Sequence, residues 1–226
     1  MTPAPGAPGA PANATARQLL GVAERLFAEH GIAGVSLRQI AAEAGSLNNS
    51  AVRYHFGTKD DLLRAIFAWR LPELLQRRAL LRARVDPGDL RAQVEAHLLP
   101  LLELAEAPDC SYVGFIEQLE RAGNIELLVR QPDVMASFDD FVDQMQRLLR
   151  SVPEPARGLR IRQAHALTVH VAAERERAVN RDDTREPFGL FVSAVVDGFT
   201  GFLAAPASPE TRRLVRRRRA ETDRSR

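Results

Sequence analysis

The segment of residues 36–59, SLRQIAAEAGSLNNSAVRYHFGTK, constrains the fold of this chain more than any other segment. Ser36 and Gln39 have the spacing of a capping box at the start of a helix, and Gly45 stands where a helix end requires a residue with positive φ. The apolar positions on either side of this glycine recur at helical spacing, at Leu37, Ile40, Ala41, Ala44, Val52 and Phe56. The segment therefore predicts two short helices joined by a tight turn.

The second of these helices carries polar side chains on its outer face. Asn49 and Arg53 form one polar pair at i and i+4, and Ser50 and Tyr54 form a second pair beside it. A short helix with a thin apolar edge and an outer face of this composition is suited to contacting base edges in DNA. The pattern predicts a helix-turn-helix DNA-binding unit.

A helix before this unit is expected to complete its core. Thr15 and Gln18 have capping-box spacing, and apolar residues follow them at helical spacing until Gly31. Two short helices cannot bury a core alone, so we expect the first helix to supply the missing apolar face.

A fourth helix is expected directly after the unit. Thr58 would cap it, with Asp61 at the reciprocal position, and its apolar face continues toward Arg84. Pro72 lies inside this segment and is expected to kink the helix without ending it. The helix would join the DNA-reading unit to the rest of the chain as a lever.

The remainder of the chain is also expected to be helical. Five further segments with helical periodicity are separated by Pro and Gly, and they span residues 89–106, 111–122, 133–151, 154–179 and 186–205. No alternating strand pattern occurs, so the sequence predicts an all-α fold of about nine helices. The chain then divides into a tail (1–13), a helix-turn-helix domain with its linker helix (14–70), a second helical domain (71–205) and a basic tail (206–226).

The two tails differ in charge. Residues 1–13 are uncharged and rich in Pro, Ala and Gly; without a basic start and an apolar run they are not a signal peptide, and we expect disorder. Residues 206–226 carry eight arginines against three acidic residues, within a chain of net charge +2. A solvated, frayed end is the expectation for this second tail, with added phosphate contacts on DNA as the alternative.

The apolar segment of residues 188–205 is expected to be a buried helix. A membrane span is disfavoured because a central charge such as Asp197 costs about 2.5–3.5 kcal/mol on insertion. One bulky stripe would face the core of the chain, and its members are Phe191, Val195, Phe199 and Phe202. A second stripe of small residues predicts a close helix contact across a two-fold axis, at Ala194, Gly198, Gly201 and Ala205. The preceding helix would contribute a face to this four-helix dimer interface, with Ile161, His165, Thr168 and Ala172.

Residues 15–67 resemble the TetR family of bacterial transcriptional regulators. The resemblance is carried by LFAEHGIAGVSLRQIAAEAG and by YHFGTKDDLL, which combine a first helix ending in Phe and Gly, a Ser-capped second helix and a Lys at the start of the fourth. It implies a cytoplasmic homodimer that represses transcription at a palindromic double-stranded DNA operator. It also implies that residues 71–205 bind a small-molecule effector, which releases the protein from DNA.

The resemblance assigns DNA contacts to the helix-turn-helix. The expected contact residues are Ser36, Arg38, Asn48, Asn49, Ser50, Arg53, Tyr54, His55 and Lys59. Among these, His55 and Lys59 look like the pair that contacts phosphates. The turn between the two helices is one residue longer than is common in the family, so either Arg53 or Tyr54 could face the bases.

Candidates for the effector pocket are apolar or mixed side chains on helices of the second domain. They are His97, Tyr112, Phe115, Met135, Phe138, Met145, His165 and His170. Met and Phe at helical spacing are also typical of a core, and that alternative stays open. The histidines lack the spacing of a metal site, so no metal and no cofactor are expected.

Three other classes of protein fit the sequence less well. An enzyme is disfavoured, because the chain has no glycine-rich phosphate loop, no nucleophile elbow and no metal-ligand spacing. A sequence-independent DNA-binding protein would have a more basic body, and a helical adaptor would merely share the fold. The single cysteine, Cys110, excludes a disulfide framework and agrees with a cytoplasmic location.

Overall fold

The computed structural model describes residues 13–46, 51–123, 126, 131–183 and 186–224. Within these ranges the chain forms helices and no strand, which confirms the all-α prediction. The helices in chain order are α1 (Ala14–Gly34), α2 (Leu37–Glu43), α3 (Ala51–Phe56), α4 (Lys59–Arg82), α5 (Leu90–Ala105), α6 (Tyr112–Arg121), α8 (Pro132–Leu148), α9 (Ala156–Asn180), α10 (Phe188–Ala204) and α11 (Pro209–Arg224).

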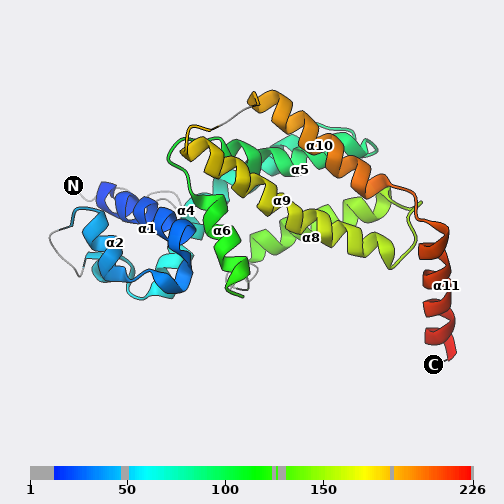
Figure 1. Cartoon of the computed structure of the whole chain (residues 1–226), viewed down its shortest axis with the longest axis horizontal. Helices are drawn as coiled ribbons and strands as arrows, with labels where there is room; N and C mark the ends of the chain where they lie inside the picture. The colour runs from blue at the N-terminus through cyan, green and yellow to red at the C-terminus, as the bar shows by residue number, and fades with distance from the viewer. Residues whose placement is uncertain (1–12, 47–50, 124–125, 127–130, 184–185, 225–226) are drawn as a thin grey trace.

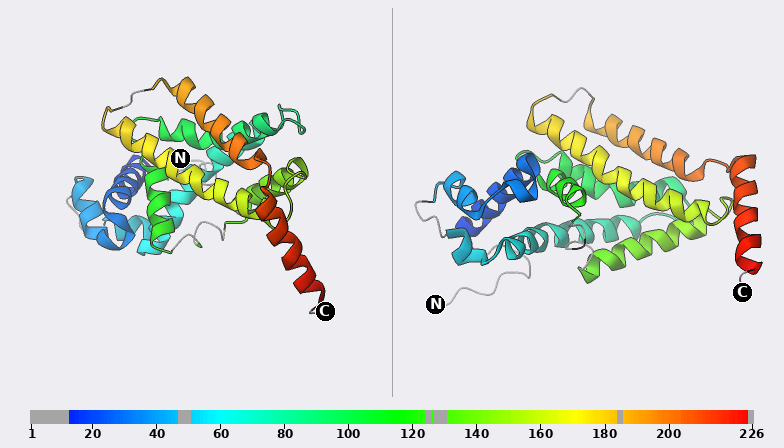
Figure 2. Two further views of the ribbon diagram at one scale, coloured as in Figure 1. Left: turned by 45° about the vertical axis from the view of Figure 1, so that its right-hand side comes forward. Right: turned by 60° about the horizontal axis from the view of Figure 1, so that its bottom comes forward.

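The molecule is elongated, with the first three helices at one end and α11 at the other (Figure 1). The long helix α4 leaves the N-terminal helices and runs along the helical body (Figure 2). Helices α9 and α10 run side by side, and α5 contacts both of them. Helix α8 contacts α4, α5 and α9. Within the described ranges the body consists of α5, α6, α8, α9 and α10, and α4 connects these helices to the N-terminal unit.

Two of the three predicted capping boxes are present. At Ser36 the backbone N–H of Gln39 donates to the hydroxyl at 3.2 Å, and the Gln39 side chain accepts from the Ser36 N–H at 2.8 Å. Thr58 and Asp61 form the same reciprocal pair at the start of α4. Both helices therefore begin where local hydrogen bonding predicts.

The predicted capping box of α1 is wrong. Asn13 caps this helix instead, because its Oδ1 accepts from the N–H of Ala16 at 2.8 Å. Gln18 does not take part in the cap. Its Nε2 donates to the carbonyl oxygen of Ala44 at 3.0 Å, which links α1 to the end of α2. An asparagine caps as well as a threonine does, so the earlier residue begins the helix.

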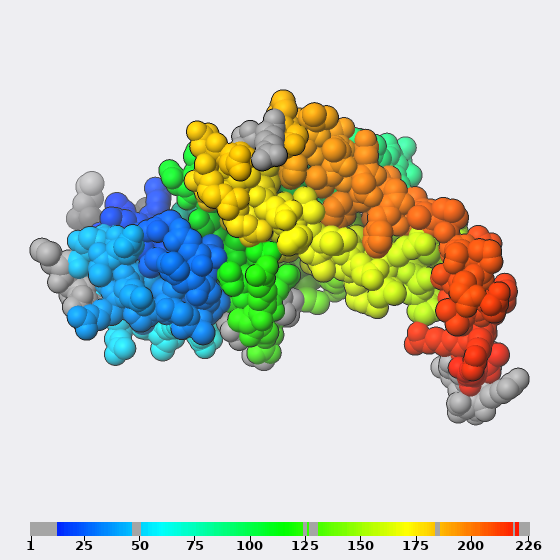
Figure 3. All heavy atoms as spheres, in the orientation of Figure 1, coloured from blue at the N-terminus to red at the C-terminus, as the bar shows by residue number. Residues whose placement is uncertain are grey.

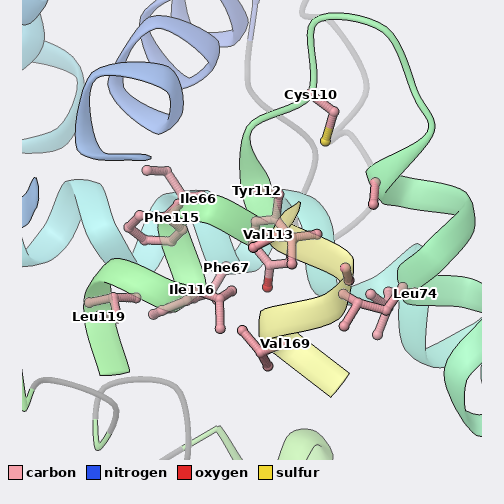
Figure 4. Packing of buried hydrophobic residues seen from close by; sticks show 14 of the residues in the cluster. Ile66, Phe67, Leu74, Cys110, Tyr112, Val113, Phe115, Ile116, Leu119 and Val169 are labelled. Carbon is pink, nitrogen blue, oxygen red and sulfur yellow. The ribbon is translucent and has the colours of Figure 1, made fainter. Parts of the chain in front are cut away.

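The N-terminal unit packs against α6 through one apolar core. The ring of Phe115 lies 6.0 Å from that of Phe27 in α1 and 5.5 Å from that of Phe67 in α4, between centroids. Figure 4 shows Phe115 beside Ile66, with Val113 and Val169 further along the same cluster. Helix α6 thus joins the core of the N-terminal unit to the core of the body.

The core-facing stripe of α10 differs from the prediction. Its fully buried side chains are Val192, Val196 and Leu203, while Phe191, Val195 and Phe199 are only half-buried. Phe202 is wrong as a core residue, since it is 38% exposed. Helix α10 packs against both α5 and α9, and these contacts bury a different set of its positions from the expected stripe. On α9, Ile161, Thr168 and Ala172 are likewise buried inside the chain and do not face outward.

Residues 209–224 form α11, so the expectation of a frayed tail is wrong. The helix stands away from the body (Figure 3). Val215 is buried, and Arg212 donates to the carbonyl oxygen of Ala207, which ties the start of α11 to the segment before it. This helix is the tenth in the described ranges and accounts for the one beyond the nine expected.

No single helix in the described ranges has the length and apolar content of a membrane span. Helix α10 and residues 209–218 reach that length only together, as a pair bent by 53°.

Candidate functional site

Helix α3 exposes the two side chains that the sequence assigns to base contacts. Arg53 is exposed, and Tyr54 is 84% exposed with its ring edge against His55, at 5.3 Å between centroids. The opposite face anchors the helix through Val52, which is fully buried. An exposed aromatic ring of this size contributes nothing to the core, so its polar and apolar atoms are available to a partner.

Residues 47–50, directly before α3, lie outside the described residues. The predicted DNA contacts of Asn48, Asn49 and Ser50 fall on them and remain predictions. Of the flanking candidates, Ser36 caps α2 and Arg38 is exposed on the same helix.

Lys59 has a structural role beside its predicted phosphate contact. Its Nζ donates to the carbonyl oxygen of Val35 at 2.6 Å and lies 5.6 Å from the ring centroid of Phe27. Burial lowers the pKa of this amine from its usual value. Together with Arg53 it lines an open hollow where α2, α3 and α4 meet, whose other lining residues are Leu37, Gly57 and Thr58. Two cations and the N-terminus of α4 make this hollow suited to a phosphate group.

A cavity of about 410 Å³ lies between α4, α5, α6, α8 and α9. Five of the eight predicted pocket residues line it, namely His97, Tyr112, Met135, Phe138 and His165. The remaining three lie elsewhere in the chain. Phe115 and Met145 are buried in the core, and Nδ1 of His170 at the surface lies 3.0 Å from Oε1 of Glu117.

The polar groups of the cavity are few. Arg78 of α4 donates from Nε to the carbonyl oxygen of His97 at 3.1 Å. Neither ring nitrogen of His97, nor Nδ1 of His165, has a hydrogen-bond partner in the described part of the chain. Burial and the charge of Arg78 lower the pKa of His97 well below its usual value and that of His165 to about 4. Both imidazoles are therefore neutral at pH 7, and each has one donor and one acceptor nitrogen.

Buried carboxylates connect the walls of the cavity to the N-terminal unit. Glu24 of α1 accepts from Arg70 of α4 and from the N–H of Ser111 at the start of α6, at 3.1 Å. Glu176 of α9 accepts from the N–H groups of Val113 and Gly114 at 2.8 and 2.7 Å. Burial raises the pKa of Glu176 to about 7, against the opposing effect of these two backbone bonds.

The sequence contains a signal for these connecting residues, in charged side chains at core positions of two helices. Glu24 lies on the apolar stripe of α1 between Leu20 and Phe27, and Arg78 lies two turns after Leu71 on the inner face of α4. A charged residue at a core position of an amphipathic helix is paired or functional, because burying an unpaired charge is costly.

Within the described residues, no group of three or more His, Cys, Asp or Glu side chains could hold a metal ion. The lone thiol, Cys110, is buried, and burial with the charge of Glu24 raises its pKa to about 12. A thiol with so high a pKa is inert at pH 7.

Residues 19–66 match the family model for bacterial regulatory proteins of the tetR family. A search of curated proteins found none that matches the chain in sequence.

Several solved structures share the fold of the chain. SCO4454, a TetR-family transcriptional regulator from Streptomyces coelicolor, is 22% identical with a TM-score of 0.52, over 84% of this chain and 94% of its own. AmtR from Mycobacterium smegmatis is 19% identical with a TM-score of 0.57, over 92% of each chain. The fatty acid degradation regulator FadR from Bacillus halodurans is 17% identical with a TM-score of 0.56, over 84% of this chain and 96% of its own. Residues 19–66 thus carry the DNA-binding unit of the tetR family of bacterial regulatory proteins, and the chain shares the fold of solved TetR-family regulators over most of its length.

Proposed function

We propose that this protein is a ligand-responsive repressor that binds a palindromic DNA operator as a homodimer and leaves it when a small molecule fills the cavity. The observation that carries the proposal concerns α4 and α6. Each helix forms part of the cavity wall, and each also contacts the helix-turn-helix unit, α4 at α1 and α3 and α6 at α1. A molecule in the cavity therefore touches the two elements that hold the DNA-reading helix.

The DNA-binding role rests on the outer face of α3. Arg53 is suited to a guanine edge, and Tyr54 to an apolar or hydrogen-bonding contact with a neighbouring base. Arg38, His55 and Lys59 would contact phosphates and fix the orientation of the helix on the duplex. We place the DNA-binding domain at residues 14–70 and the ligand-binding and dimerisation domain at residues 71–205, with α4 spanning both.

The homodimer rests on the outer faces of α9 and α10. Both helices expose apolar side chains, with Leu167 on α9 and Leu190 on α10, the latter 60% exposed. Ala194, Gly198 and Gly201 are on the outer side of α10 and leave room for the close approach of a partner helix. An isologous contact would place two copies of α3 at a fixed distance, which must be about 34–36 Å for adjacent major-groove segments.

Release from DNA follows from a difference in affinity between two states. An inducer must bind more tightly to a geometry in which the two α3 helices do not match that spacing. Movement of α4 by the ligand would change this spacing because α4 begins directly after α3. A DNA partner also agrees with the cytoplasmic location that we expect for the protein.

Selection of duplexes from a random pool by the full-length protein tests the proposal. We expect an inverted repeat to be enriched, and we expect the mass of the free protein in solution to be twice 25.0 kDa. Equal retention of all sequences would favour a sequence-independent DNA-binding protein, and retention of none would favour an adaptor. Either result contradicts the proposed repressor.

A further inference from the structure

Arg78 is a cation in the cavity wall without a carboxylate partner in the described part of the chain. Its Nε donates to the carbonyl oxygen of His97, and its Nη1 lies 3.4 Å from the hydroxyl oxygen of Ser137. Burial and the neighbouring charge of Arg82 lower its pKa to about 10, so it stays charged at pH 7. Most arginines that are shielded from water pair with an acid, and this one has capacity left for a further acceptor.

His97 is a second polar group whose hydrogen bonds are unmade. Its side chain is 2% exposed, lines the cavity and is held in a stack with Phe141 at 3.7 Å between centroids. An unpartnered polar group at this depth lowers the stability of the fold. The neighbouring Nδ1 of His165 is also unpartnered within the described residues. The neutral imidazoles of His97 and His165, beside the guanidinium of Arg78, form a polar end in an otherwise apolar cavity.

The rest of the wall is almost entirely apolar. It is formed by Leu71, Leu74, Leu75, Leu101, Val113, Ile116, Val134, Met135, Phe138 and Val169, with Tyr112 as a mixed side chain. Among the described lining residues Glu120 is the only carboxylate, and it is not among the charges that shift Arg78, His97 or His165. The cavity is therefore divided into a cationic end and an apolar remainder.

We propose that the effector is an amphipathic monocarboxylate, whose carboxylate pairs with Arg78 and accepts a hydrogen bond from His97 or His165. Its hydrocarbon part fills the apolar remainder. This identification of the ligand class rests on the proposed ligand-responsive function. A planar carboxylate matches the fork of a guanidinium, and a single cation balances a single negative charge. A phosphate monoester would bring a second charge, and the neighbouring cation, Arg82, already pairs with Asp140 at 3.4 Å.

A series of matched probes tests the charge preference. The probes are the unbranched eight-, ten- and twelve-carbon carboxylates, each compared with the alcohol and the amine of equal length, by titration calorimetry on the full-length protein. One charge-assisted pair predicts that the carboxylate of the best length binds on the order of 10- to 100-fold more tightly than its alcohol. Binding of the alcohol or amine as tightly as the carboxylate, or binding of no probe, would overturn the assignment.

Two variants on α4 separate the role of Arg78 from a general effect of charge. Arg78→Gln should reduce carboxylate affinity to that of the alcohol and leave alcohol affinity unchanged. Arg78→Lys retains the positive charge and should keep part of the preference for the carboxylate. It therefore still tests the role of the charge if Arg78→Gln does not fold. Arg77→Gln is the matched control, because Arg77 pairs with Glu103 away from the cavity. This variant should retain the full preference for the carboxylate over the alcohol.

Failure of this inference can be told apart from failure of the proposed function. If carboxylates bind through Arg78 and operator affinity does not change, the ligand class is right and the coupling is wrong. If operator binding responds to an uncharged or cationic compound and Arg78→Gln has no effect, the coupling is right and the ligand class is wrong.

Discussion

The carboxylate of Glu24 in α1 accepts two hydrogen bonds from the guanidinium of Arg70 in α4, at 2.8 and 2.9 Å. Glu24 is only 1% exposed, and its Oε1 also accepts from the N–H of Ser111 at the start of α6. One buried acid thus joins α1 to both α4 and α6, two helices that line the cavity. The pair is the polar centre of the junction between the two halves of the protein.

Removing the cation from this pair is expected to be costly. Arg70→Met leaves Glu24 buried with a single backbone donor, and a broken buried pair costs about 3–5 kcal/mol of the free energy of unfolding. Urea denaturation of the full-length protein measures the loss. Arg77→Met is the control, since Arg77 forms an equally bidentate pair with Glu103 at the surface and should change stability little. Equal stability of the two variants would show that the Glu24 pair does not stabilise the junction.

Gly114 is expected to be required where α1 and α6 approach each other. A Cβ at this position would lie 2.9 Å from the Glu176 carboxylate and 3.1 Å from the Cβ of Ala28. We expect Gly114→Ala to lower the free energy of unfolding by about 1–3 kcal/mol, because the overpacked contact outweighs the helix propensity gained.

Gly21→Ala on α1 provides the comparison for Gly114. A Cβ placed on Gly21 would meet nothing within 4 Å, so alanine should raise stability by about 0.5–1 kcal/mol. In both thermal and urea denaturation, the unfolding midpoint should therefore fall for Gly114→Ala and rise for Gly21→Ala. A shift of Gly114→Ala in the same direction as Gly21→Ala would disprove the tight contact.

His97 is expected to lower stability in the absence of ligand. His97→Leu removes two unpartnered nitrogens, worth about 1–3 kcal/mol, and loses a ring stack worth about 0.5–1.5 kcal/mol. The variant should therefore be more stable by on the order of 1 kcal/mol and bind carboxylates more weakly. Such an exchange of stability for binding is typical of ligand sites.

The pH dependence of this effect has a definite sign. The pKa of His97 is lowered well below its usual 6.5, so below pH 6.5 the unfolded chain binds a proton that the folded chain does not. Stability of the wild-type protein is lost as the pH falls through this window, and His165, with a pKa of about 4, acts in the same direction. The advantage of His97→Leu in urea should grow between pH 7 and pH 5. A constant advantage would mean that His97 takes up its proton in the folded state.

A substitution at Gly198 tests dimerisation separately from the folding of one chain. A Cβ at this position would meet nothing within 4 Å, so Gly198→Arg should leave the protomer folded. We expect it to shift the protein from dimer to monomer in sedimentation equilibrium, because the long side chain blocks the close approach of a partner helix. Gly189→Arg is equally open and lies off the small-residue stripe, so it should remain dimeric. A dimeric Gly198→Arg would place the interface elsewhere.

Local patterns predicted the helix starts well and the orientation of helices less well. The capping boxes at Ser36 and Thr58 depend on residues three apart, so sequence alone places them. The start of α1 was misplaced because Asn13 and Thr15 both suit a cap and only the fold decides between them. The buried face of α10 was misjudged because nearly all its residues are apolar, and packing against α5 and α9 selects Val192 and Val196.

The cavity shows the same division between local and tertiary information. His97 and His165 could be proposed from composition, but Phe115 fell into the core because α6 presents it toward Phe27 and Phe67. Arg78 was not among the candidates, although its position on the inner face of α4 marked it as a buried charge.

The affinity of the protein for its selected operator, in the presence of excess unrelated duplex, tests the proposed DNA-binding role most directly. Fluorescence anisotropy with labelled operator would compare the wild-type protein with Arg53→Ala and Tyr54→Ala. Because both side chains are exposed, neither variant should change thermal stability, and loss of a base contact should weaken operator binding at least about tenfold. We expect the wild-type protein to keep its operator against the competitor duplex and at least one of the two variants to lose it. If competitor duplex displaces the wild-type protein from the operator as readily as it displaces both variants, the proposed DNA-binding role is contradicted.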